Sequence, residues 1–321
     1  MLSAFPDHGR TALCALLERC DVDILLAQQI QVASLLAGHL LSLTQEQAGH
    51  MAGRGCRLLA MSMRRNHWLS VPCSAPERGE EAGHVRFAIR NPLCANLAPQ
   101  PSPVMTAFLP PAEQILLVGI MDALGLDRVR LIGHDWGGWV GFLLCLRQPD
   151  RIARFLALGI LHPWQQLDLT LLRNLWRFGY QGIIASPLLG AWLVRHPGLI
   201  GRLMRWDSAD REQWREQDLR WYTELLQDPA RARASVLLYR TFLLREALPV
   251  LRGRYRDARL QVPTLVLVGA RDLTVPPSLL HGYEPYADAM AVEVVPEAGH
   301  FLPEECPALV ADRANVFFGR G

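Results

Sequence analysis

One strand-turn-helix segment constrains the fold of this chain more than any other feature. Residues 129–132 are apolar except for Arg130 and predict a buried strand, and residues 139–147 have the apolar pattern of a buried helix. A glycine-flanked turn, Gly133-His134-Asp135-Trp136-Gly137, joins them. A small-x-nucleophile-x-small pattern between strand and helix indicates a sharp turn that lifts its central side chain above the sheet. That side chain is Asp135, and a carboxylate attacks saturated carbon to form an alkyl ester.

The segments around this turn extend it into an alternating pattern. A helix over 113–124 precedes the strand, and an apolar run over 154–161 follows the second helix. Later segments predict a strand at 264–269, a helical turn at 277–283, a strand at 291–295 and a helix at 307–318. Short strands that alternate with helices predict an α/β fold, with a mostly parallel sheet covered by helices on both faces.

Residues 162–257 have a different character. They are rich in Leu, Trp and Arg with helical periodicity, and no strand pattern interrupts them. Since they stand between two parts of the predicted sheet, we expect an inserted helical cap over the carboxyl edge of the strands, where open α/β folds bind ligands. The predicted domains are therefore a core, residues 1–161 and 258–321, and a cap, residues 162–257.

The first 112 residues fit this pattern poorly. Strand candidates occur at 30–36 and 56–63, and the Pro-rich stretch 91–111 predicts a loop.

Composition excludes several function classes. The chain has 321 residues, half of them apolar, and a net charge of only +2 without a long basic run, so we expect a globular protein that does not bind nucleic acid. Seven scattered cysteines without a CxxC pair predict neither a disulfide framework nor a metal site. The sequence begins without a signal-peptide pattern and has no convincing membrane span. We therefore expect a cytoplasmic protein with no membrane anchor.

Two further side chains complete a set with Asp135. The strand at 264–269 is followed by Asp272, and the strand at 291–295 is followed by His300. The carboxyl ends of parallel strands meet at one edge, so all three side chains should face the same crevice. In such a set the acid orients the histidine, and the histidine removes a proton from the water that hydrolyses the ester on Asp135.

The intact motif Gly133-His134-Asp135-Trp136-Gly137, with Asp272 and His300 in that chain order, resembles the epoxide hydrolase and haloalkane dehalogenase branch of the α/β-hydrolases. The resemblance extends from about residue 113 to the end of the chain. It implies an α/β-hydrolase fold, a two-step reaction through an alkyl-enzyme ester, and no metal or organic cofactor.

The resemblance also implies roles for residues of the predicted cap. Epoxide hydrolases open the ring with two cap tyrosines, whereas dehalogenases hold the leaving halide with indole or amide N–H groups. Tyr180 and Tyr239 match the family's two tyrosine positions, and Tyr222 fits packing better. These tyrosines favour an epoxide hydrolase.

The family's oxyanion hole uses two backbone N–H groups. One would belong to Trp136, and the best match for the other is His39, in a segment that keeps only the glycine of the family's His-Gly-x-Pro loop. Ser62 likewise replaces an aspartate of the family pattern. The N-terminal third has either diverged, been repositioned by the Pro-rich stretch, or is not the product of an intact gene.

The sequence thus predicts hydrolysis of a small apolar epoxide by water, in a monomer or homodimer. Two alternatives stay open. A haloalkane dehalogenase would use the same three residues with Trp136 on the halide, and a more distant possibility is a catalytically impaired binding protein of the same fold.

Overall fold

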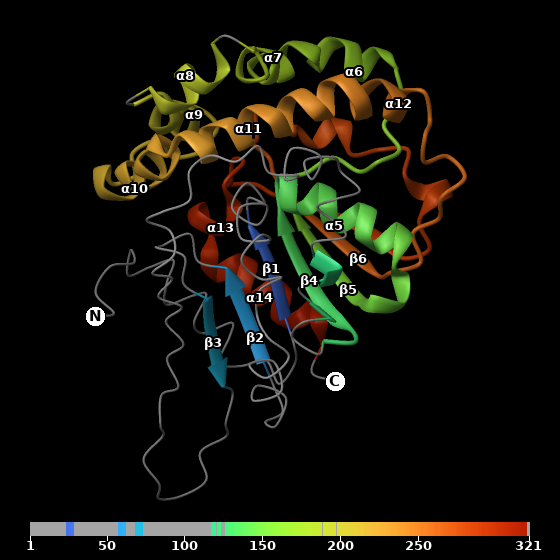
Figure 1. Cartoon of the computed structure of the whole chain (residues 1–321). Coiled ribbons are helices and arrows are strands. Elements are labelled where there is room, and N and C mark those ends of the chain that lie inside the picture. The colour runs from blue at the N-terminus through green and yellow to red at the C-terminus, as the bar shows by residue number, and fades with distance from the viewer. Residues whose placement is uncertain are drawn as a thin grey trace, which may run out of the picture.

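The structure of the chain is a computed structural model (Figure 1). It describes three N-terminal strands by their backbone, at 24–28, 57–61 and 68–72. Beyond these it describes residues 117–119, 121–122, 126–187, 189–196 and 198–319.

Seven strands form one sheet in the order β3-β2-β1-β4-β5-β6-β7. Every neighbouring pair is parallel except β2 and β3, which are antiparallel. The mostly parallel sheet predicted from the sequence is therefore confirmed. The strands are β1 Ile24–Gln28, β2 Arg57–Met61, β3 Trp68–Pro72, β4 Val129–His134, β5 Ile152–Leu158, β6 Thr264–Gly269 and β7 Met290–Val295.

The central strands are buried on both faces. Successive side chains of a strand point to opposite sides of the sheet, and each side here packs against an apolar cluster. On β5, Phe155 and Ala157 join the apolar cluster that contains helix α5 (Trp136–Arg147), whereas Leu156 and Leu158 join the cluster of helix α14 (Pro307–Phe318). Burial on both faces explains why these strands read as continuous apolar runs in the sequence.

The chain between β5 and β6 is helical, as predicted. Figure 1 shows these helices across the top of the molecule, over the ends towards which the arrows of β1, β2 and β4 point. They are α6 Leu169–Asn174, η4 Leu175–Phe178, α7 Gly179–Ile184, α8 Gly190–Arg195, α9 Leu199–Trp206, α10 Glu216–Gln227, α11 Pro229–Thr241, the π-helical η5 Phe242–Ala247 and α12 Leu248–Leu251. Outside this block lie η3 Pro149–Arg151, η6 Pro277–Leu279, η7 Glu284–Tyr286 and α13 Leu302–Glu305.

Some predicted elements differ from the observed ones. The second helix begins at Trp136, three residues earlier than predicted, because the turn at Asp135 leads into it directly. Strand β3 was not predicted, and β1 lies before the predicted strand at 30–36. That segment, the Pro-rich stretch 91–111 and the ends of the helix predicted at 113–124 lie outside the described residues.

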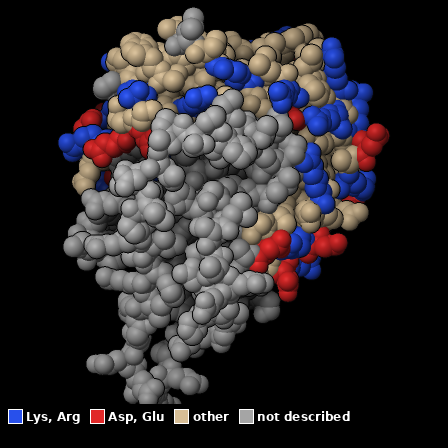
Figure 2. Space-filling view, in the orientation of Figure 1, with Lys and Arg blue, Asp and Glu red and all other residues tan. Residues whose placement is uncertain are grey.

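Arginines and acidic residues are mixed on the surface. In Figure 2 arginine side chains are scattered over the upper helices and the side of the molecule, with acidic side chains among them. Within the described residues, no helix is long and apolar enough to cross a membrane.

Candidate active site

Asp135 lies at the apex of a strained turn. Its φ of 52° and ψ of −122° make it the only non-glycine residue with positive φ in the described part of the chain. Such backbone costs on the order of 1–3 kcal/mol and occurs mainly at functional sites. The turn is tight, since a Cβ on Gly133 would lie 2.5 Å from the carbonyl oxygen of Gly137. Gly133 is therefore required by the close approach of strand and helix.

Asp272 and His300 follow the carboxyl ends of β6 and β7, as the sequence predicts. Asp272 follows β6 and is buried, and its Oδ2 lies 3.0 Å from Nδ1 of His300. Its Oδ1 accepts a hydrogen bond of 2.6 Å from the backbone N–H of Val275. On the other side of the ring, Nε2 of His300 lies 3.9 Å from Oδ1 of Asp135. The structure thus brings the three predicted residues together, with His300 in the middle.

The electrostatics of the three groups are coupled. Burial lowers the pKa of His300, but the carboxylates of Asp272, Asp207 and Asp135 outweigh it and raise that pKa to about 10. Burial also raises the pKa of Asp135, while the charge of His300 and the backbone N–H of Trp136 oppose the rise. Each group therefore depends on the charge state of its neighbour.

His134 holds the backbone of His300 in place. Nε2 of the buried His134 ring lies 2.9 Å from the carbonyl oxygen of His300. Burial, together with the charge of His300, lowers the pKa of His134 to about 3, so the ring is neutral and Nε2–H donates to that carbonyl. The sequence contained this histidine within the motif but did not indicate its function.

A pocket of about 130 Å³ opens above these groups. Asp135 and His300 form part of its wall, and two predicted cap tyrosines, Tyr180 and Tyr239, form another part. Apolar side chains line much of the remainder: Ile184, Val194, Ile200, Leu203, Met204, Leu226 and Phe301.

The two tyrosines contact each other and the motif. Their ring centroids are 6.0 Å apart in an edge arrangement, and the ring of Tyr239 packs against Trp136 at 5.3 Å. Burial raises the pKa of both phenols, and the negative charge of Asp135 raises it further. Both side chains are therefore neutral proton donors over the physiological range. Tyr222 also lines the pocket, but its hydroxyl donates to Oε1 of Glu304 at 3.0 Å.

Of the two predicted oxyanion donors, only Trp136 lies among the described residues. Its backbone N–H is directed to the carboxylate of Asp135. His39 lies outside the described residues, as does Ser62.

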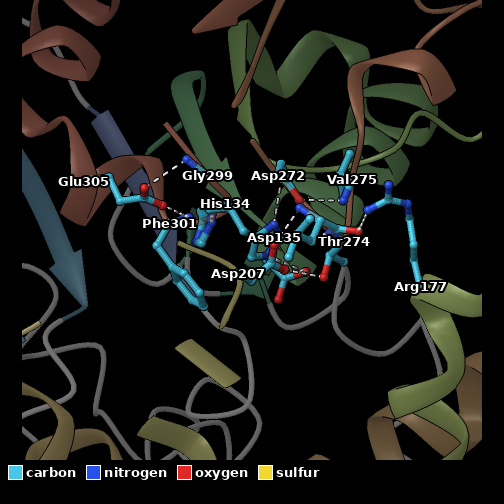
Figure 3. A network of polar contacts seen from close by, with 12 residues as sticks. His134, Asp135, Arg177, Asp207, Asp272, Thr274, Val275, Gly299, Phe301 and Glu305 are labelled. Carbon is cyan, nitrogen blue, oxygen red and sulfur yellow. Dashed lines mark hydrogen bonds and ion pairs between the residues drawn. The ribbon is translucent and has the colours of Figure 1, made fainter. Parts of the chain in front are cut away.

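Asp207 is a residue of this site that the sequence did not reveal. It follows α9, is buried, and lines the pocket together with Thr274 and His300. Figure 3 shows its side chain beside Thr274. Its pKa is raised to about 6, chiefly by burial and against the opposing charge of His300. No motif marks this aspartate, because its proximity to the site depends on the path of the helical segment.

Asp207, Asp272 and His300 offer three potential metal ligands within 4.8 Å of one another. Both oxygens of Asp272 already have partners, and the carboxylate of Asp207 accepts hydrogen bonds from Leu273 and Thr274. The cluster is therefore explained by hydrogen bonding among the protein groups, and we assign no metal to it.

Comparisons with known proteins agree with the family resemblance of the motif. A family model described as alpha/beta hydrolase fold matches residues 111–182. Epoxide hydrolase 2 of Siraitia grosvenorii is 46% identical over 44 residues, which are 14% of this chain and 14% of that protein. Haloalkane dehalogenase 2 of Mycobacterium tuberculosis is 26% identical over 213 residues, 64% of this chain and 70% of that protein.

Among solved structures, Cfl2 of Burkholderia cenocepacia superposes with a TM-score of 0.62 at 18% identity, over 93% of this chain and 89% of that one. At this identity the likeness concerns the fold. Together with the family match, it shows that the chain has the α/β-hydrolase fold predicted from the sequence, and the relatives show that it is similar to the epoxide hydrolase and haloalkane dehalogenase branch.

Proposed function

We propose that this protein hydrolyses small apolar epoxides to vicinal diols through an ester on Asp135. The observation that carries the proposal is the shared pocket. A strained carboxylate and a histidine paired with an acid face two neutral tyrosines, of which Tyr239 is buried and Tyr180 is half-buried. We further propose that residues 162–257 act as a cap domain on a core formed by residues 1–161 and 258–321.

In the first step the Asp135 carboxylate attacks an epoxide carbon and the C–O bond of the ring breaks. The departing oxygen becomes an alkoxide and takes a proton from Tyr180 or Tyr239. Formation of the ester removes the charge of Asp135, which is one of the causes of the raised tyrosine pKa values. The phenols thus become better acids as the bond to Asp135 forms.

In the second step His300 takes a proton from water, and the hydroxide attacks the ester carbonyl of Asp135. The N–H of Trp136 stabilises the resulting oxyanion. The protonated histidine then supplies a proton to the leaving alkoxide, and the proton of the new carboxyl group returns to the tyrosinate. The ester also favours the neutral form of His300, which acts as the base, because loss of the Asp135 charge lowers the pKa of His300.

The pocket supports an apolar substrate of modest size. An engineered apolar cavity of about 150 Å³ accommodates benzene. A volume of about 130 Å³ is therefore suited to a short aliphatic epoxide or to one with a single small ring.

One observation favours the alternative, a haloalkane dehalogenase. Trp206 lines the pocket and could provide a second indole N–H beside Trp136 for a halide. The proposed residues Asp135, Asp272 and His300 would then have the same roles, without proton donation by the tyrosines.

A substrate panel with two variants distinguishes these functions. The parent is incubated with aliphatic and aromatic epoxides and with haloalkanes, while diol and halide are measured. His300→Ala should accumulate an adduct that mass spectrometry locates on Asp135, and Asp135→Asn should form none. Halide release without any diol would refute the epoxide hydrolase proposal, and absence of both products would favour a binding protein.

A further inference from the structure

The chain immediately after α9 passes between the two loops that carry Asp272 and His300. Residues 207–209 belong to the helical segment between β5 and β6, whereas both loops belong to the sheet. Figure 3 shows Asp207 beside Thr274, within a connected set of polar contacts.

The side chain of Asp207 holds the loop of Asp272. Its Oδ1 accepts hydrogen bonds from the backbone N–H of Leu273, at 2.7 Å, and of Thr274, at 3.3 Å. Its Oδ2 accepts one from the hydroxyl of Thr274. Arg177, from η4, donates to the carbonyl of Leu273 at 2.6 Å. The segment that follows Asp272 is thus fixed by two residues of the inserted helices.

The backbone of the same segment holds the loop of His300. The carbonyl oxygen of Asp207 accepts a hydrogen bond of 2.8 Å from the N–H of His300. The N–H of Ala209 donates to Oε2 of Glu305 at 2.7 Å, and that oxygen also accepts from Gly299 at 2.9 Å. The packing is close, since a Cβ on Gly299 would lie 2.6 Å from the carbonyl oxygen of Asp207.

Asp207 therefore contacts both sides of the acid-histidine pair. Only 5% of its surface is exposed, so its hydrogen bonds are protected from competition by water. The charged and titratable groups around it are Asp272, His300 and Tyr180, with Asp135 and His134 next to His300, and with Arg177 and Glu305 bound to the loops that it holds. A carboxylate in this position both fixes two loops and adds negative charge near His300.

We propose that Asp207 is a positioning residue for the second chemical step, which aligns Asp272 with His300 and tunes the basicity of His300 from the inserted helices. This inference rests on the proposed two-step function. It assigns to the helical segment a part in ester hydrolysis, in addition to ring opening by its tyrosines.

Two substitutions separate the two contributions of Asp207. Asp207→Asn has the same shape and keeps an acceptor for Leu273, while its amide can donate to the hydroxyl oxygen of Thr274, so mainly the charge is lost. Asp207→Ala removes the side-chain hydrogen bonds as well. The matched control is Glu246→Gln, which neutralises another buried acid of the inserted segment, one that pairs with Arg254 and does not line the pocket.

The rates of ester formation and ester hydrolysis are measured in single turnovers of the full chain at several pH values. For Asp207→Ala we expect hydrolysis to slow by roughly 10- to 100-fold with little change in ester formation, since small displacements of catalytic groups cost about that much. For Asp207→Asn the midpoint of the hydrolysis profile should fall by about one pH unit or more, because a unit charge near His300 is lost. Glu246→Gln should leave both unchanged.

An Asp207→Ala protein that folds and hydrolyses the ester within twofold of the parent would overturn the inference. The inference would also be overturned if Asp207→Asn left the midpoint of the hydrolysis profile unchanged. This second test does not depend on whether the alanine variant folds. Titration of the His300 ring by NMR tests the charge effect without turnover: its pKa should fall in Asp207→Asn. A parent without activity on epoxides or haloalkanes would refute the proposed function, and an unchanged His300 titration would refute this inference.

Discussion

Replacement of Asp272 by asparagine should block the second chemical step and spare the first. Both groups that Asp272 binds are donors: Nδ1–H of His300 at 3.0 Å and the backbone N–H of Val275 at 2.6 Å. A carboxylate can accept from both at once, whereas an amide has one acceptor and one donor end. In Asp272→Asn, one of the two donors must therefore face an NH₂ group.

Of the two orientations of the amide, the one that blocks hydrolysis is favoured. If the NH₂ group faces His300, the imidazole must carry its proton on Nε2, the nitrogen directed to Asp135, and cannot take one from water. If it faces Val275, a buried N–H loses its partner at a cost of about 1–3 kcal/mol. An asparagine that forces the wrong tautomer lowers the rate of a comparable serine hydrolase about 10⁴-fold. We expect hydrolysis to slow by roughly 10³- to 10⁴-fold, which corresponds to about 4–5 kcal/mol.

A rapid-mixing experiment with the proposed substrate class measures both steps. Trp136 adjoins the nucleophile, so its fluorescence should report ester formation, and quenched samples analysed by mass spectrometry give the decay of the adduct. Asp272→Asn should form the ester at a rate close to that of the parent and then retain it. Hydrolysis within tenfold of the parent, in a variant with cooperative thermal unfolding, would show that the acid does not orient the histidine.

Three further outcomes are expected. Tyr239→Phe and Tyr180→Phe keep the packed rings but lose the proton donor, so each should slow ester formation by roughly 10-fold or more, as stopped-flow kinetics would show; equal rates would leave the tyrosines as packing residues. Ester formation should be lost as the pH falls through the pKa of Asp135, because only the carboxylate attacks, and the midpoint should lie above the usual 3.8 since burial raises this pKa. Gly138→Ala places a Cβ 2.5 Å from Cγ2 of Ile160 and should lower the free energy of unfolding by about 1–3 kcal/mol in a denaturant titration.

Local patterns were sufficient for the central part of the sheet. Strands β4 to β6 are largely buried and appear as short apolar runs, so their positions and their parallel arrangement could be predicted. Strand β7 lies at the edge of the sheet and is mostly half-buried, but its run of valines was still recognisable. The positions of Asp135, Asp272 and His300 at strand ends followed from the same pattern. Strand β3 has no comparable signal, because its five residues include Ser70 and Pro72 and do not form a continuous apolar run.

By itself, then, the sequence determined the fold class and the three residues at the sheet edge, because strand ends and glycine-flanked turns are local features. Only the tertiary structure decided how these groups interact: the 3.0 Å contact between Asp272 and His300, the two tyrosines on one pocket wall, and Asp207 between the two loops. Asp207 lies far from both loops in sequence and has no motif. Its function depends on burial, hydrogen bonding and charge, which arise only when the helical segment packs over the sheet.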